Sequence, residues 1–225
     1  MALSAPQPAD LEALARLPDH IVGELIEGEL YLSPRPALRH ALAASALNAI
    51  LGDQFQGRGA RGWWILFEPE LHFGPNVVVP DLAGWRRSRL PQVPADPFLT
   101  LAPDWVCELL STSTRSLDRS RKLPLYSRQG VSHVWLIDPE ARTLETFVRR
   151  GRFWMLTATW TGADKVRAQP FESCEIDLLR LWGEAGEALG AGLAHDAPVS
   201  EPSPAPRRSA RRASRRTPPP AAARP

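Results

Sequence analysis

Apolar and polar residues alternate with two different periods along this chain, and the two periods predict a succession of strands and helices. Over residues 21–34 apolar positions flank a Glu27-Gly28 pair, which predicts a β-hairpin that turns at this pair. From Ala37 to Phe55 apolar positions recur at helical spacing. We expect an amphipathic helix that packs on a sheet, with His40 in its first turn as a surface or capping residue.

Two further apolar stretches, residues 62–74 and 76–85, predict adjacent strands joined by a turn. The second contains the run Val77–Val79, which is typical of a strand buried on both faces. Asp81 interrupts this run, directly after Pro80. An aspartate there either faces solvent where the strand leaves the core or is held at the strand end for a chemical purpose, and Pro-Asp alone is a common turn dipeptide.

The segment from Trp105 to Asp138 is predicted to fold as strand, turn, helix and strand. In the first strand the period of two places Val106, Glu108 and Leu110 on one face. Glu108 therefore sits among large apolar side chains. Because a buried carboxylate without a partner is costly, we expect a compensating charge close to it.

The helix predicted over residues 117–129 carries Asp118 and Lys122 at positions i and i+4, so that both lie on one face. A surface salt bridge is the simpler explanation of such a pair. However, the helix must pack on the strand that carries Glu108, because only a short turn joins them, and Lys122 borders the apolar stripe. Pro124 indicates either a helix start near Lys122 or a kink there.

The formal net charge of +2 conceals an uneven distribution. Residues 197–225 hold seven arginines and the single acid Glu201, so the first 196 residues together carry about −4 and lack the basic footprint of a tight nucleic-acid binder. We expect one folded domain over residues 1–195. The Pro/Ala/Arg-rich tail over residues 196–225 is predicted to be disordered, and either binds nucleic acid without sequence preference or is simply solvated.

Several classes of protein are not supported by the sequence. The two cysteines are too few for a disulfide framework, no apolar run is long enough for a membrane span, and the N-terminus does not resemble an export signal. We therefore expect a cytoplasmic protein without a membrane segment. Motifs typical of nucleotide-binding loops, serine hydrolases and zinc sites are also absent from the sequence.

The remaining candidate chemistry consists of carboxylates and one lysine. Asp81 and Glu108 would converge if their strands are neighbours, and with a backbone carbonyl such as that of Leu109 they offer the hard oxygen ligands that Mg²⁺ or Mn²⁺ prefers. Lys122 would orient or deprotonate the nucleophile and stabilise a pentavalent transition state. Asp118 would hold this lysine in place, or it would accept a contact from a group outside the direct ligands of the metal. Such a site suits phosphodiester hydrolysis.

The ordered succession of Pro80-Asp81, residues 107–126 and residues 130–139 resembles the bacterial Uma-type restriction endonucleases, a branch of the PD-(D/E)XK nuclease superfamily. The resemblance spans about residues 17–160. It implies an α/β (α+β) fold with a restriction-endonuclease-like core, in which helices flank a mixed central β-sheet with added β-hairpins. It also implies a divalent-metal-dependent endonuclease acting on DNA, and cleavage of both strands would favour a homodimer.

By this resemblance Asp81 and Glu108 correspond to the two metal-binding acids. The plain superfamily pattern has a lysine two residues after the second acid, where this chain has Leu110. Lys122 with Asp118 matches instead the Asp-x-x-x-Lys pattern that this branch carries on the following helix. The resemblance therefore implies that the catalytic lysine has moved from the strand to the helix.

The hairpin sequence ELIEGELY is also similar to the N-terminal signature of the family, which makes Glu24 a candidate third acid. A second interpretation is a catalytically inactive nuclease-fold module that binds nucleic acid or a protein partner. The mildly acidic body and the arginine-rich tail are compatible with it. Loss of metal affinity in a Glu108 variant would favour the enzyme over this module.

Overall fold

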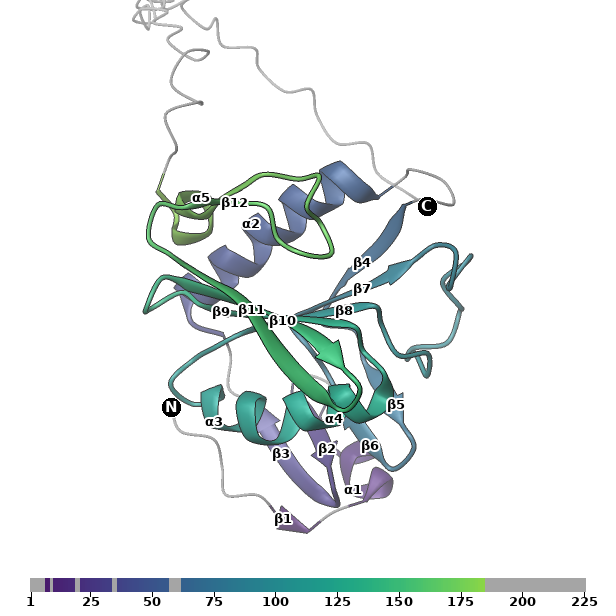
Figure 1. The fold of residues 1–225 in the computed structure, drawn as a ribbon. Coiled ribbons are helices and arrows are strands. Elements are labelled where there is room, and N and C mark those ends of the chain that lie inside the picture. The colour runs from purple at the N-terminus through teal and green to yellow at the C-terminus, as the bar shows by residue number, and fades with distance from the viewer. Residues whose placement is uncertain (1–6, 9, 19–20, 34–35, 57–61, 185–225) are drawn as a thin grey trace, which may run out of the picture. The chain divides into compact units, whose positions relative to one another are not determined.

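The computed structural model describes residues 7–8, 10–18, 21–33, 36–56 and 62–184, and the structural statements below concern these residues. Their strands form a six-stranded sheet, a five-stranded sheet and a two-stranded ribbon, and helices pack against both faces of the six-stranded sheet (Figure 1). The predicted domain boundary near residue 195 and the basic tail lie outside the described residues.

The six-stranded sheet is mixed, and its strands lie in the order β11-β10-β9-β8-β7-β4. β8 and β9 are parallel, whereas the other neighbouring pairs are antiparallel. The predicted fold class, a mixed central sheet flanked by helices, is confirmed. The strands are β4 (Trp63–Phe67), β7 (Leu82–Arg86), β8 (Trp105–Leu109), β9 (His133–Asp138), β10 (Thr143–Arg150) and β11 (Phe153–Thr161).

The five-stranded sheet contains the predicted N-terminal hairpin and has the order β1-β3-β2-β6-β5. At the hairpin turn Glu27 has φ 54° and Gly28 has φ 80°, and this pair of left-handed residues suits the twist of a two-residue hairpin. The strands are β1 (Gln7–Pro8), β2 (Val22–Ile26), β3 (Glu29–Ser33), β5 (Leu71–Phe73) and β6 (Asn76–Val78). The ribbon pairs β12 (Lys165–Val166) with β13 (Ile176–Asp177).

The two strands predicted over residues 62–74 and 76–85 are each divided into two. The first part of the first stretch, β4, pairs with the last part of the second stretch, β7, in the six-stranded sheet. The remaining parts, β5 and β6, pair in the five-stranded sheet. The breaks fall at Pro69 and Pro80, whose missing N–H groups cannot continue a strand ladder. Asp81 therefore lies where the chain passes from one sheet to the other.

Two sets of helices cover the six-stranded sheet on opposite faces (Figure 1). On one face, α2 (Leu38–Phe55) and α5 (Leu178–Trp182) pack on a core that includes Trp105 and Trp135. On the other face lie α3 (Arg115–Leu117) and α4 (Leu123–Gln129). The short α1 (Leu11–Ala15) contacts β2. None of the described helices combines the length and the apolar character needed to cross a bilayer.

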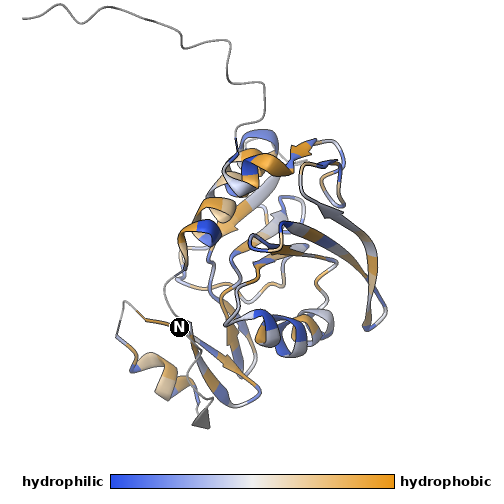
Figure 2. Cartoon of the chain, turned by 90° about the vertical axis from the view of Figure 1, so that its left-hand side faces the viewer, coloured by the Kyte–Doolittle hydropathy of each residue, from blue (hydrophilic) through white to orange (hydrophobic). Residues whose placement is uncertain are grey.

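The predicted helix over residues 117–129 is one continuous helical segment that begins two residues earlier and contains a widened turn. Residues Asp118–Lys122 form a π-helical turn, in which the N–H of Leu123 donates to the carbonyl of Asp118. Pro124 lies two residues after Lys122, so the widened turn accommodates the residue that was expected to start or kink the helix. The segment shows both hydrophilic and apolar positions, as expected for an amphipathic helix (Figure 2).

Gly84 in β7 offers a test of the packing between the sheet and the tryptophans. A Cβ there would lie 3.1 Å from Trp105 and 3.2 Å from Trp63, so Gly84→Ala should lower the free energy of unfolding by about 1–3 kcal/mol. Urea denaturation measures this change. Gly52→Ala is the control, because its Cβ would meet nothing closer than 3.8 Å within α2, and it should stabilise the protein. A Gly84→Ala protein as stable as the wild type would contradict the packing.

Candidate active site

The ammonium group of Lys122 lies at the centre of a buried cluster of charged side chains. Its Nζ is 2.9 Å from Glu24 Oε1, 2.9 Å from Glu108 Oε1 and 3.8 Å from Asp118 Oδ1. All four side chains are 3–4% exposed. The Asp118–Lys122 pair is therefore not a surface salt bridge, and the helix does bring Lys122 over the same face of the sheet as Glu108.

The cluster draws on three parts of the fold, and Asp118 shares one of them with Lys122. Glu24 belongs to β2 in the five-stranded sheet, Glu108 belongs to β8 in the six-stranded sheet, and Lys122 belongs to the widened helical turn. Glu24 Oε1 also accepts a hydrogen bond of 2.8 Å from the N–H of Val79, and the hydroxyl of Tyr126 donates to Glu108 Oε1 at 2.5 Å. The cluster thus joins two sheets and a helix.

Burial controls the protonation of this cluster. It raises the pKa of Glu108 well above its usual range, although Lys122 opposes the shift, and it raises the pKa of Asp118 to about 7. Burial would lower the pKa of Lys122, but Glu108 and Glu24 outweigh it and the net pKa is raised. Both Glu108 and Asp118 therefore have raised pKa values, and with a pKa of about 7 the carboxyl of Asp118 is partly protonated near neutral pH.

Asp81 lies beside this cluster at the edge that reaches solvent. Leu82 pairs with Cys107 at the end of the antiparallel register of β7 and β8, and Asp81 directly precedes Leu82 as Glu108 directly follows Cys107. Asp81 Oδ2 accepts a hydrogen bond of 2.7 Å from the N–H of Leu109. Its side chain is 16% exposed, in contrast to the buried cluster behind it.

His40 contacts Asp81, and the expectation that it is a surface or capping residue is wrong. Its Nε2 is 3.2 Å from Asp81 Oδ1, and its side chain is only 15% exposed. Burial lowers the pKa of His40, but the hydrogen bond and charge of Asp81, together with the backbone of Leu109, give a net raised pKa. The sequence carries no local signal for this contact, which joins the first turn of α2 to the start of β7.

The donor chemistry at this site fits a hard divalent cation, since Asp81 and Glu108 both present carboxylates at one place in the fold. Within the described residues, however, no group of three or more His, Cys, Asp and Glu side chains is arranged to enclose a metal ion. Lys122 and Tyr126 contact Glu108, and His40 contacts Asp81. Binding of an ion would require these contacts of Glu108 and Asp81 with protein donors to be broken.

The sequence profile of the Uma2 family, described as "Putative restriction endonuclease", matches residues 8–179. The chain belongs to the Uma2 family. A crystal structure of a "putative nuclease belonging to DUF820" from Anabaena variabilis ATCC 29413 is 22% identical and superposes with a TM-score of 0.65 over 78% of this chain and 98% of that chain. At this identity the likeness concerns the fold. No curated protein matches the chain. The resemblance seen in the sequence is confirmed.

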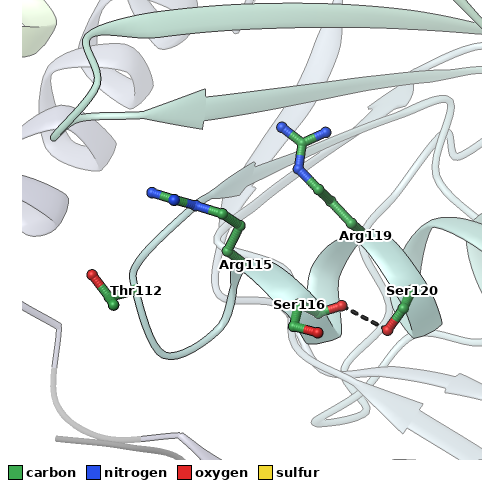
Figure 3. A pocket seen from close by; sticks show the side chains of 5 residues that line it. All are labelled: Thr112, Arg115, Ser116, Arg119 and Ser120. Atoms are coloured by element: carbon green, nitrogen blue, oxygen red, sulfur yellow. Dashed lines mark hydrogen bonds between the residues drawn. The ribbon is translucent and has the colours of Figure 1, made fainter.

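A surface cleft of this Uma2-family protein lies on the outer side of the same helical segment. It is lined by two arginines and three hydroxyl residues, namely Thr112, Arg115, Ser116, Arg119 and Ser120 (Figure 3). Arg115 pairs with Asp138 at 2.6 Å, and Arg119 pairs with Glu145. Both arginines remain partly exposed, so the cleft presents basic and hydroxyl groups to solvent.

Lys122→Met should strongly destabilise the protein, because it leaves Glu24 and Glu108 buried without their cation. We expect a loss of about 3–5 kcal/mol in the free energy of unfolding, measured by urea denaturation. Glu108→Gln in the Lys122→Met background should recover part of this loss. Lys165→Met removes an exposed lysine and serves as the control. Equal stability of Lys122→Met and the wild type would exclude the ion cluster as a structural element.

Asp118→Asn should change how stability depends on pH. The carboxyl of Asp118 has a pKa of about 7 in the folded protein, above its usual value of 3.8, so the native state holds this proton more tightly than the unfolded state. This group therefore lowers the stability as pH rises from about 4 to 7. The free energy of unfolding of Asp118→Asn minus that of the wild type should therefore be more positive at pH 8 than at pH 5, as measured by urea denaturation. The exposed Asp96→Asn is the control, and a pH-independent difference would contradict the assignment.

Proposed function

We propose that this Uma2-family protein is a divalent-metal-dependent endonuclease that hydrolyses phosphodiester bonds in DNA. The burial of Lys122 between Glu24 and Glu108, beside the partly exposed Asp81, carries this proposal. A protein core gains little from burying such a group, because desolvation offsets most of the attraction between the charges. Clusters of this kind with shifted pKa values are typical of functional sites.

In this proposal Asp81 and Glu108 hold the metal ion, either Mg²⁺ or Mn²⁺. When bound, such an ion neutralises charge on the scissile phosphate and makes water more acidic. Tyr126 orients Glu108 through its hydroxyl, and the N–H of Leu109 orients Asp81. The two carboxylates are thus held in position before a substrate arrives.

Lys122 acts on the nucleophile and on the transition state. Its ammonium group can donate to the attacking water and to the phosphate oxygens that gain charge. Glu24 fixes Lys122 from the side of the five-stranded sheet, while Asp118 lies one helical turn away on the same face. We therefore assign Glu24 and Asp118 to positioning Lys122 rather than to the metal.

The DNA would approach where Asp81 and His40 reach solvent, since the other carboxylates are closed off by protein. Arg115 and Arg119 in the cleft of Figure 3 offer guanidinium groups to phosphates that flank the scissile one. We further propose a cytoplasmic location, which suits the two free buried cysteines. Cleavage of both DNA strands would use two copies of the chain.

A nuclease-fold module that binds nucleic acid without cleaving it is the second candidate. It is favoured by the engagement of Asp81 and Glu108 with protein donors and by the lack, within the described ranges, of a ready three-ligand arrangement. Such a module should bind DNA with a steep salt dependence, and binding should weaken when residues 197–225 are deleted. Its binding should survive Glu108→Gln.

Nicking of supercoiled plasmid in Mg²⁺ or Mn²⁺ tests the enzyme directly. Asp81→Asn and Glu108→Gln keep the shape of each side chain but remove its charge, so each should lower the nicking rate by at least about 100-fold. Asp104→Asn is the matched control, because Asp104 is a buried, paired carboxylate that directly precedes β8 and lies at its opposite end from Glu108. It should retain activity.

Three outcomes would contradict the proposal. Activity unchanged in both Asp81→Asn and Glu108→Gln would show that another site cleaves. No nicking by the folded wild type with either ion, combined with salt-dependent DNA binding, would favour the binding module. Cleavage of single-stranded RNA but not of DNA would keep the chemistry and change the substrate.

A further inference from the structure

A group of arginines lies at the end of the six-stranded sheet opposite to Asp81. The strand register aligns Gly84 in β7, Trp105 in β8, His133 in β9 and Val148 in β10 in one row across the sheet. β7 and β10 run in the same direction, so both end on the same side of this row. The residues just beyond the row form an arginine strip, which consists of Arg86, Arg87, Arg149, Arg150 and Arg152.

The arginines of this strip lack acidic partners. Several exposed arginines elsewhere pair with carboxylates, as Arg128 does with Glu27. In the part of the chain that the structure describes, no acid forms an ion pair with any arginine of the strip. Asp104 lies beside the strip, but it already pairs with Arg89. The charge of about −4 over residues 1–196 therefore conceals a local excess of positive charge.

Aromatic stacking and hydrogen bonds hold three of these guanidinium groups in place. The guanidinium carbon of Arg86 lies 4.6 Å from the ring centroid of Trp63, and that of Arg87 lies 3.6 Å from the ring centroid of Trp64. Arg149 donates to two backbone carbonyl groups. A guanidinium group that is already held loses less conformational freedom when it binds an anion.

The spacing of the strip suits the backbone of a DNA duplex. β8 and β9 lie between β7 and β10, and neighbouring strands are about 4.8 Å apart, so the backbones of Arg86 and Arg150 lie about 14 Å apart. This distance corresponds to about four base-pair steps along a duplex. The side chains of Arg86, Arg150 and Arg152 are exposed, and guanidinium groups bind phosphate oxygens through paired hydrogen bonds.

We propose that the arginine strip is a docking surface for the phosphate backbone of duplex DNA, separate from the active site. Asp81 directly precedes β7 and Arg86 ends it, so their backbones lie about 17 Å apart along the strand. The choice of DNA rests on the proposed function, but contact through the strip needs neither a metal ion nor cleavage. An anionic membrane also attracts arginines, but guanidinium groups held at fixed positions suit the regularly spaced phosphates of a duplex better than a fluid lipid surface.

Fluorescence anisotropy of a short labelled duplex, titrated in EDTA at a series of NaCl concentrations, tests the strip. The variant combines Arg86→Gln, Arg87→Gln, Arg150→Gln and Arg152→Gln. Because each lost phosphate contact removes about 0.9 from the slope of log affinity against log salt, this slope should become shallower by about 2–4. The affinity at low salt should fall by at least about 10-fold. The double variant of the exposed Arg150 and Arg152 alone should show about half of the change in slope.

The matched control removes the same number of charges from exposed arginines that pair with acids. It combines Arg16→Gln, Arg121→Gln, Arg128→Gln and Arg142→Gln. Its net charge equals that of the strip variant, so a general effect of charge would appear in both. We expect the control to bind DNA within about threefold of the wild type and to keep the salt slope.

An unchanged salt slope in the folded strip variants, or an equal loss of affinity in the control, would overturn the proposal. Loss of sedimentation with phosphatidylserine vesicles in the strip variant, with its DNA affinity unchanged, would overturn it in favour of a membrane surface. Asp81→Asn should bind DNA in EDTA as the wild type does. Absence of plasmid nicking therefore refutes the proposed function, whereas the binding titration alone decides the strip.

Discussion

The ammonium group of Lys122 between two buried carboxylates is the interaction on which the rest of this structure depends. Glu24 and Glu108 lie in different sheets, so their shared cation joins those sheets to the helical segment above them. Replacing such a cluster by apolar side chains of similar volume is often neutral or stabilising in proteins. Its presence is therefore better explained by chemistry than by stability.

The irregular features of the backbone follow from the same constraint. The widened turn at Asp118–Lys122 places both charged side chains on the buried face just before Pro124. Pro80 ends one strand ladder, and Asp81 begins the crossing to the other sheet beside Glu108. Regular helix and strand geometry is interrupted at the two places that supply the cluster and its solvent-facing neighbour, which agrees with the tendency of such irregularities to occur at functional sites.

Local sequence patterns predicted a large part of this arrangement, and the failures have physical causes. Alternation in β8 placed Glu108 among apolar residues, and the i, i+4 spacing placed Lys122 on the helix face that packs against it. The division of residues 62–74 and 76–85 between two sheets was not predicted, because hydropathy does not reveal which strand a segment pairs with. Contacts of His40 and of the Tyr126 hydroxyl were missed, since they depend on long-range packing.

The balance of charge gives a further reason to expect a metal ion. Four carboxyl groups, those of Glu24, Asp81, Glu108 and Asp118, gather around Lys122 and the titratable ring of His40. The protein has too little fixed positive charge there, and it compensates by retaining a proton, as the raised pKa of Asp118 indicates. A divalent cation would supply the missing positive charge without that proton. An inactive binding module would have no need to maintain such an excess of buried acid, so the surplus of carboxylates favours the enzyme.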